Sequence, residues 1–497
     1  MHVDQGDLYG VKGALNVVRH ARLRRAGVRA PVVVRKRGNG RGAKGAQEGG
    51  CVKDRTAEDP PAGVSRKRET KQAREGFNTG CAEPVVWTER MLTALIKGVK
   101  GGKWFSLIDK VYSIQTLKAA FERVEANKGA AGIDHETVEM FSKRLDTNLD
   151  KMSEQLQKGT YRPRPLRRKW IFKLGSREKR PLGIPTIRDR VAQTALRYVL
   201  EPIFEIGFAL HSYGFRPGRG CKDALRRVDD LLKKEHWYVV DADLKSYFDT
   251  IPFEPLMRLI RNKVSDGRVL ALIESFLQQD IMDGLSQWTP EEGAPQGAVI
   301  SPLLSNIYLD PLDHLMAERG FEMVRYADDF VILCRTQAEA VQALALVRQW
   351  TTEAGLQLHP DKTCIAYAPG DGFEFLGYRF HHGKRNVRRK SLAKFKATIR
   401  SKTRRCNGHS LEHIVRSVNG TSIGWFNYFR HAHRYTFSSL DGWIRMRLRS
   451  ILRKRRGGRG RGRGADHQRW PNAFFAKHGL FSLTAAHAAA CQSARER

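Results

Sequence analysis

The chain has 497 residues, of which 41% are hydrophobic and 28% charged, so it can form ordinary packed cores over about three domains. This composition excludes a collagen-like chain and a wholly disordered one. The 88 lysines and arginines exceed the 52 acidic residues, which gives a net charge of +36 and a pI near 10.2. The electrostatic field of so much positive charge speeds association with a polyanion, so we expect a nucleic-acid partner. A small neutral substrate would not need this charge.

The cysteines and apolar stretches indicate the compartment. The seven cysteines are scattered and include no Cys-x-x-Cys pair, so we expect neither a disulfide framework nor a zinc module. No apolar stretch approaches the roughly 18 residues of a membrane span, and no secretion signal follows Met1. We expect a cytoplasmic bacterial protein, nucleoid-associated at most, without a membrane partner. The first fifty residues hold eleven lysines and arginines against three acidic residues, which leaves an organellar location as the minor alternative.

The first part of the chain differs in composition from the rest. Residues 1–84 are rich in Gly, Arg, Lys and Ala and have too few large apolar side chains to offset the entropy of ordering, so we expect a disordered basic arm. Helical spacing begins near residue 85 and returns over 116–126, followed by a loop at 129–134. Residues 161–185 alternate basic and apolar positions between prolines, which predicts short strands with positive faces.

Strands and then basic helices are expected in the remainder. The ranges 237–251 and 321–334 are rich in Val, Ile, Tyr and Phe but enclose aspartates, which predicts strands that carry carboxylates. Residues 381–470 hold 25 lysines and arginines against three acidic residues, so +22 of the net charge lies there. Apolar residues at helical spacing persist in this region, which indicates a folded basic helical domain, and only 453–464 is typical of a flexible linker.

The strongest chemical signal is Arg325-Tyr-Ala-Asp-Asp-Phe-Val-Ile-Leu-Cys334. Its two adjacent aspartates should lie at the tip of a β-hairpin, where their mutual repulsion needs a cation to offset it. Two Mg2+ ions about 3.5–4 Å apart are the usual arrangement for phosphoryl transfer. The alternative interpretation is an exposed Asp-Asp turn without a function.

A second acidic pair, Asp241 and Asp243, shares one face of the strand predicted over 237–251 because side chains alternate along a strand. One of the two should complete the metal site, since Mg2+ takes oxygen ligands and retains waters and substrate phosphates. The alternative is a solvated carboxylate pair at a strand end. A third motif, Pro295-Gln-Gly297, opens a helix with small residues, so its backbone can lie close to a base pair, although such loops are common.

In this order the three motifs resemble the palm of a reverse transcriptase, and among families the sequence is most similar to the group II intron-encoded reverse transcriptase/maturases. The resemblance extends over roughly residues 85–485. Its further motifs are Arg180-Pro-Leu-Gly-Ile-Pro-Thr-Ile-Arg-Asp-Arg190, His211-Ser-Tyr-Gly-Phe-Arg-Pro-Gly-Arg219, Gly129-Ala-Ala-Gly-Ile-Asp134, Gly424-Trp-Phe-Asn-Tyr-Phe-Arg430 and Arg469-Trp-Pro-Asn-Ala-Phe-Phe475.

The resemblance implies an α+β fold of right-hand polymerase architecture, with fingers and palm built on antiparallel sheet and a helical thumb or X domain. We expect four regions along the chain. They are the basic arm at 1–84, fingers and palm at 85–380, the thumb or X domain at 381–456, and a basic linker with a nucleic-acid-binding segment at 457–497. Many family members end in a zinc-supported endonuclease, but only one cysteine follows residue 469, so no endonuclease is expected.

The family pattern also implies roles for individual residues. Asp243, Asp328 and Asp329 match the metal-binding catalytic triad. Asp243 is preferred to Asp241 because Phe248, five positions later, matches the aromatic steric gate that excludes a ribose 2′-OH. The substrate-binding matches are Lys173 and Arg180 for the triphosphate, Gln296 and Gly297 for the loop at the nascent pair, and Lys362 for protonation of the leaving pyrophosphate.

The implied function is RNA-directed DNA synthesis with two Mg2+ ions. The implied partners are group II intron RNA, an RNA template with a DNA primer, target DNA and deoxynucleoside triphosphates, in support of intron splicing and mobility. The alternatives are a splicing-only maturase and a related polymerase recruited to defence or diversity generation. We expect Arg445, Arg447 and Arg449 to bind RNA, because arginines two apart on a helix cannot all face one core.

Overall fold

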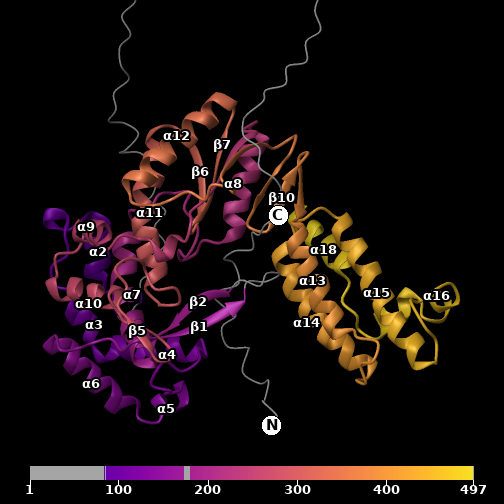
Figure 1. The fold of residues 1–497 in the computed structure, drawn as a ribbon, viewed down its shortest axis with the longest axis horizontal. Helices are drawn as coiled ribbons and strands as arrows, with labels where there is room; N and C mark the ends of the chain where they lie inside the picture. The colour runs from indigo at the N-terminus through magenta and orange to yellow at the C-terminus, as the bar shows by residue number, and fades with distance from the viewer. Residues whose placement is uncertain (1–82, 84–85, 173–178, 496–497) are drawn as a thin grey trace, which may run out of the picture.

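The computed structural model describes Glu83 and residues 86–172 and 179–495. The predicted basic arm, apart from Glu83, and Lys173 lie outside the described residues. Figure 1 shows two groups of elements: fingers and palm on one side, and the basic helices near the C-terminus on the other. Within the described residues, no helix is both long and apolar enough to cross a membrane.

The fingers begin with short helices packed around the long helix α7 (Ile187–Glu205), most of whose residues are buried. The loop predicted at 129–134 lies against the start of α7. A Cβ on Gly132 would lie 2.6 Å from Thr186 Cα, so only glycine permits this approach. The helices before α7 are α2 (Glu89–Lys97), η2 (Lys100–Gly102), α3 (Ile108–Tyr112), α4 (Ile114–Ala126), α5 (Val138–Ser142) and α6 (Leu145–Lys158).

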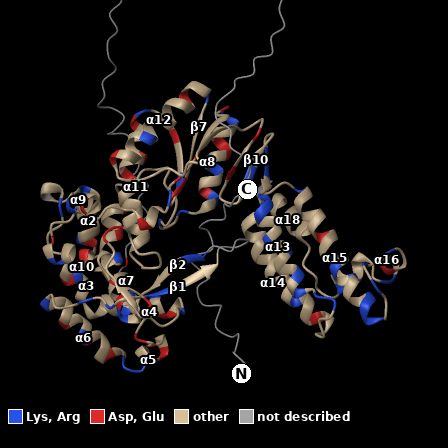
Figure 2. Cartoon of the chain, in the orientation of Figure 1, with Lys and Arg blue, Asp and Glu red and all other residues tan. Residues whose placement is uncertain are grey.

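A four-stranded fingers sheet has the order β2-β1-β4-β5. Its strands are β1 (Leu166–Phe172), β2 (Lys179–Ile184), β4 (Ile281–Asp283) and β5 (Ser286–Trp288). The strands predicted within 161–185 are thus confirmed. The sheet is antiparallel except for the short parallel pairing of β1 with β4, which joins two segments more than a hundred residues apart in the chain. The hairpin formed by β1 and β2 carries lysines and arginines (Figure 2).

The palm sheet is fully antiparallel, in the order β6-β7-β3-β8. Val240, Ala242, Phe330 and Ile332 on one face share a core with the palm helices. The residues that alternate with these along each strand point to the opposite face. There, Val239 and Val331 belong to a second core. The strands are β3 (Tyr238–Asp243), β6 (Glu322–Tyr326), β7 (Asp329–Cys334) and β8 (Cys364–Tyr367), and the helices are α9 (Phe253–Arg261), α10 (Gly267–Leu277), α11 (Ser301–Glu318) and α12 (Gln337–Glu353).

The second core runs from α8 (Cys221–Lys233) and the palm sheet into the basic helices. A three-stranded sheet in the order β11-β10-β9 joins the two parts. It is followed by the helical thumb, α13–α18. The bounds are β9 (Phe373–Phe375), β10 (Tyr378–His381), β11 (Lys384–Val387), α13 (Arg389–Lys402), α14 (Leu411–Phe429), α15 (Tyr435–Arg455), α16 (Ala465–Arg469), α17 (Asn472–Lys477) and α18 (Leu483–Arg495).

Two of the expected boundaries do not follow the packing. The boundary between 380 and 381 falls inside β10, since the sheet that ends the palm extends to Val387. The boundary at 456 separates residues that share one core, because Phe475 and Leu483 are both 0% exposed and pack with α14 and α15. The segment after 456 therefore completes the thumb rather than forming a separate unit.

Candidate active site

The two adjacent aspartates lie at the tip of the β6–β7 hairpin, as predicted. Tyr326 pairs with Asp329 across the ladder, so the turn consists of Ala327 and Asp328 alone. Ala327 has a φ of +59°, the left-handed conformation that tight hairpin turns require. Asp328 is only 3% exposed. An exposed Asp-Asp turn is thus excluded, and a buried carboxylate must be stabilised by a partner.

The strand register distinguishes between the two acidic residues of β3. Asp243 lies opposite Asp329 in the β3–β7 ladder, whereas Asp241 lies opposite Val331. Directly opposite side chains share a face, so Asp243 is the residue beside the two aspartates of the β6–β7 hairpin. Burial raises the pKa of Asp241 to about 7, and the charges of Asp243 and Glu374 add to this effect. Asp241 therefore carries a proton more readily than an ordinary aspartate does.

Lys362 reaches the same place from the segment before β8. Its Nζ donates to Asp243 Oδ2 at 2.5 Å. The backbone fixes this approach, because the N–H of His359 donates to the carbonyl of Asp243 at 2.7 Å and that of Lys245 to the carbonyl of Gln357 at 2.8 Å. Lys362 is thus ion-paired with Asp243.

The three aspartates fit Mg2+ in chemistry, since carboxylate oxygens are the ligands that Mg2+ takes in phosphoryl-transfer sites. The side chains of the described part of the chain nevertheless do not gather into a preformed three-ligand metal cluster. Asp243 is paired with the Lys362 ammonium instead. A cation that binds Asp243 would therefore lie beside the ammonium of Lys362.

A pocket between palm and fingers contains the predicted gate. Phe248, on the short helix η3 (Tyr247–Asp249), is 7% exposed and lines this pocket with Pro181, Gly183 and Gln296. The Nε of Arg180 donates to Gln296 Oε1 at 2.7 Å. The structure thus brings together Phe248, Gln296 and Arg180.

The structure explains why the last residue of the Pro-Gln-Gly loop is glycine, which the sequence alone did not reveal. Gly297 has a φ of +112°, and a Cβ there would lie 2.3 Å from the carbonyl oxygen of Gly183. The N–H of Gly183 in turn donates to the carbonyl of Gln296 at 2.8 Å. Because Gly297 has no side chain, the loop can contact the backbone of β2. This contact is separate from the approach of a base pair to the loop that the sequence predicted.

The assignment of three arginines of α15 to RNA binding requires correction. Arg449 is 3% exposed, and its guanidinium donates to the carbonyl of Trp470 at 2.9 Å and to Asn472 Oδ1 at 3.0 Å. Arg447 donates to Oγ1 and the carbonyl of Thr403. Both residues therefore hold the thumb together. Arg445 and Arg447 are both half-buried, and for these two the role in RNA binding stays a prediction.

Sequence reasoning missed two arginines at the site. Arg168 lines the pocket and lies 4.6 Å from the ring centroid of Trp288, a cation–π contact. Arg325 is fully buried and lies on β6, in the hairpin that carries Asp328 and Asp329. The only signal for Arg325 in the sequence was its position in an apolar strand. A charge buried there needs a partner, but long-range packing decides which residue that partner is.

An antiparallel palm with carboxylates at a hairpin tip, a fingers pocket and a helical thumb defines a template-directed polymerase of the reverse transcriptase class. Residues 171–380 match the family model of reverse transcriptase (RNA-dependent DNA polymerase), and residues 392–470 match the group II intron maturase-specific domain. The chain belongs to the group II intron-encoded reverse transcriptase/maturase family.

Two relatives found by sequence support this assignment. Protein YkfC of Escherichia coli (strain K12) is 35% identical over 296 residues, which cover 51% of this chain and 77% of that protein. The group II intron-encoded protein LtrA of Lactococcus lactis subsp. cremoris is 38% identical over 201 residues, which cover 40% of this chain and 33% of LtrA. Among solved structures, a partial Cas6-RT-Cas1–Cas2 complex aligns with 50% of this chain and 41% of its own chain, at 27% identity and a TM-score of 0.32.

Proposed function

We propose that the chain copies an RNA template into DNA by attack of a primer 3′-OH on a deoxynucleoside triphosphate, at Asp243, Asp328 and Asp329. The observation that carries the proposal is the register that sets Asp243 opposite Asp329, with Asp328 buried in the adjoining turn. Two Mg2+ ions bound there would lower the pKa of the primer hydroxyl and offset charge on the pyrophosphate.

The remaining residues of the site bind and select the nucleotide. Phe248 narrows the pocket where a ribose 2′-OH would lie, so deoxynucleotides are preferred. Arg180 holds Gln296, and its guanidinium would bind the triphosphate through the paired hydrogen bonds that this group forms with phosphate. Lys362, which lies beside Asp243, would donate a proton to the leaving pyrophosphate.

A primer-extension assay tests the polymerase proposal. The full chain is incubated with a DNA primer on an RNA template, Mg2+ and either deoxynucleotides or ribonucleotides. We expect cDNA to form with deoxynucleotides only. Absence of cDNA from folded protein that binds the template–primer duplex would overturn the proposal.

Binding of group II intron RNA in support of splicing is the second proposed function. The basic thumb, which carries most of the excess positive charge of the chain, and the match to the maturase-specific domain support it. The test is the splicing rate of a group II intron at low Mg2+, measured for the intron that surrounds the gene. Polymerase activity without any effect on splicing, in a gene outside catalytic intron RNA, would favour recruitment to defence or diversity generation.

A further inference from the structure

The guanidinium of Arg325 contacts the turn that carries the catalytic aspartates. Arg325 is 0% exposed, and its Nη1 donates to the carbonyl of Ala327 at 3.0 Å. Ala327 is one of only two residues in the turn, and the next two residues are Asp328 and Asp329. A displacement of this carbonyl would therefore move the carboxylates that follow it.

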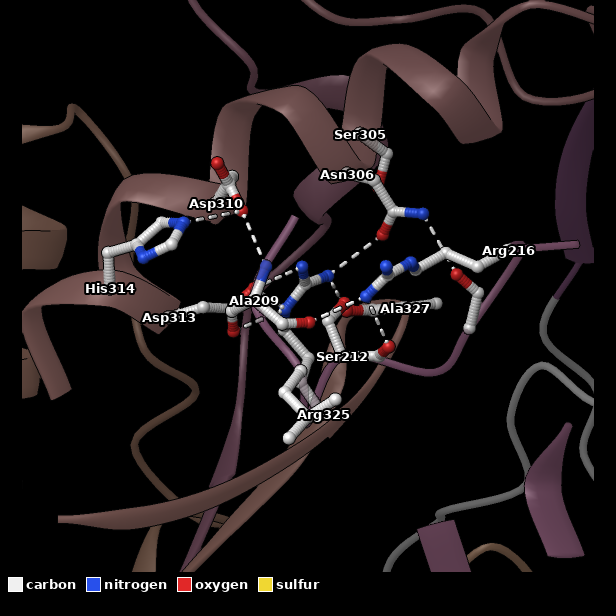
Figure 3. Close-up of polar contacts among 12 residues, drawn as sticks. Ala209, Ser212, Arg216, Ser305, Asn306, Asp310, Asp313, His314, Arg325 and Ala327 are labelled. Carbon is white, nitrogen blue, oxygen red and sulfur yellow. Dashed lines mark hydrogen bonds and ion pairs between the residues drawn. The ribbon is translucent and has the colours of Figure 1, made fainter. Parts of the chain in front are cut away.

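Helix α11 holds Arg325 in place through two side chains. Its Nε donates to Asp313 Oδ1 at 2.8 Å, its Nη2 pairs with Asp313 Oδ2 at 2.5 Å, and its Nη1 donates to Asn306 Oδ1 at 2.9 Å (Figure 3). Asp313 is 6% exposed and Asn306 is 1% exposed. A planar guanidinium can serve these acceptors together, whereas a lysine ammonium cannot reproduce the geometry.

Asn306 extends the network to the segment beneath the hairpin. Its Nδ2 donates to the carbonyl of Gly214 at 2.8 Å. A Cβ on Gly214 would lie 2.1 Å from the amide nitrogen of Ala327, so this segment also touches the turn. The turn is thus held by contacts with both the Gly214 backbone and the Arg325 guanidinium.

We propose that Arg325, held by Asp313 and Asn306, is a positioning residue that sets the geometry of Asp328 and Asp329 for cation binding. This proposal rests on the proposed function, because it assigns the network to the same site. A purely structural role would instead make the pair a stabiliser of the palm whose loss leaves cation binding unchanged.

The test replaces both charges together, in Arg325→Met/Asp313→Leu, because removing a whole buried pair often preserves folding, whereas removing one partner leaves an unpaired charge. Mn2+ affinity of the protein alone, measured by electron paramagnetic resonance, is read beside Tm and the kcat and KM for deoxynucleotides. Loss of groups that orient metal ligands lowers affinity or activity about 10- to 100-fold, so we expect falls of that size in Mn2+ affinity and kcat. KM should change little, because the pocket at Phe248 lies on other elements.

Asp266→Asn is the matched control. Asp266 is also 6% exposed, but it accepts the N–H groups of Leu107, Ile108 and Val269. The control should lower Tm without changing Mn2+ affinity. Unchanged Mn2+ affinity in the double variant would overturn the proposal, and if that variant does not fold, Arg325→Lys decides by the same measurement. Because Mn2+ binding needs no template or primer, this result is independent of whether the wild-type chain synthesises cDNA.

Discussion

Substitution of Gly297 by alanine should disable the loop that lines the nucleotide pocket. The new Cβ would lie 2.3 Å from the carbonyl oxygen of Gly183 and 2.9 Å from Leu182 Cδ1, at a φ of +112°. A non-glycine residue in such a conformation costs about 1–3 kcal/mol, and loss of the bond from the Gly183 N–H to the Gln296 carbonyl costs about 1 kcal/mol.

Together these contributions amount to about 2–4 kcal/mol. Since about 1.4 kcal/mol corresponds to tenfold, kcat/KM for deoxynucleotides in primer extension should fall roughly 30- to 1000-fold. Gly267→Ala is the control, because Gly267 begins α10 and a Cβ there has nothing within 4 Å. A Gly297→Ala protein with kcat/KM within about twofold of the wild type would show that the loop and β2 separate freely, and would refute the argument.

Three further predictions concern the gate, the thumb and pH. Phe248→Ala should allow ribonucleotide incorporation in the extension assay, and unchanged discrimination would show that Phe248 only packs the core. Arg449→Gln should lower Tm. Arg445→Gln should leave Tm unchanged but reduce the slope of log K for RNA binding against log salt concentration by about 0.7–0.9. The reverse pattern would contradict the contacts described for Arg449. Hydrogen bonding to Asp310 is the main cause that raises the pKa of His314 to about 9, so its stabilisation is full below about pH 6.5 and declines as pH rises towards 9. Because this side chain is 42% exposed, His314→Gln should destabilise the protein by at most about 1 kcal/mol in thermal melts below pH 6.5, and an equal effect at all pH values would refute this origin.

Local patterns were sufficient to predict the catalytic hairpin, because an apolar strand can tolerate adjacent aspartates only at its end. The choice of Asp243 over Asp241 depended on family resemblance in the sequence and on strand register in the structure. Register is set by contacts between β3 and β7, which are about ninety residues apart, so no local pattern contains it.

The buried arginines show where prediction from the sequence failed. Arg449 was expected to face solvent because a charge is rarely buried without a partner. Its partners, Trp470 and Asn472, follow it by 21 and 23 residues, beyond a stretch that was expected to be a linker. Arg325 likewise finds Asp313 on α11. Such pairings arise from tertiary packing, which helical spacing alone does not reveal.

The central claim is that Asp328 and Asp329 form part of a polymerase site, whereas the affinity for nucleic acid comes from other surfaces of the protein. The substitutions Asp328→Ala and Asp329→Ala test this claim most directly. Mg2+-dependent extension of a DNA primer on an RNA template is measured together with the Kd for the same duplex. We predict that cDNA synthesis is abolished while Kd stays nearly unchanged, because the basic surfaces supply the affinity. Retained polymerisation in the Asp328→Ala protein would contradict the active-site assignment.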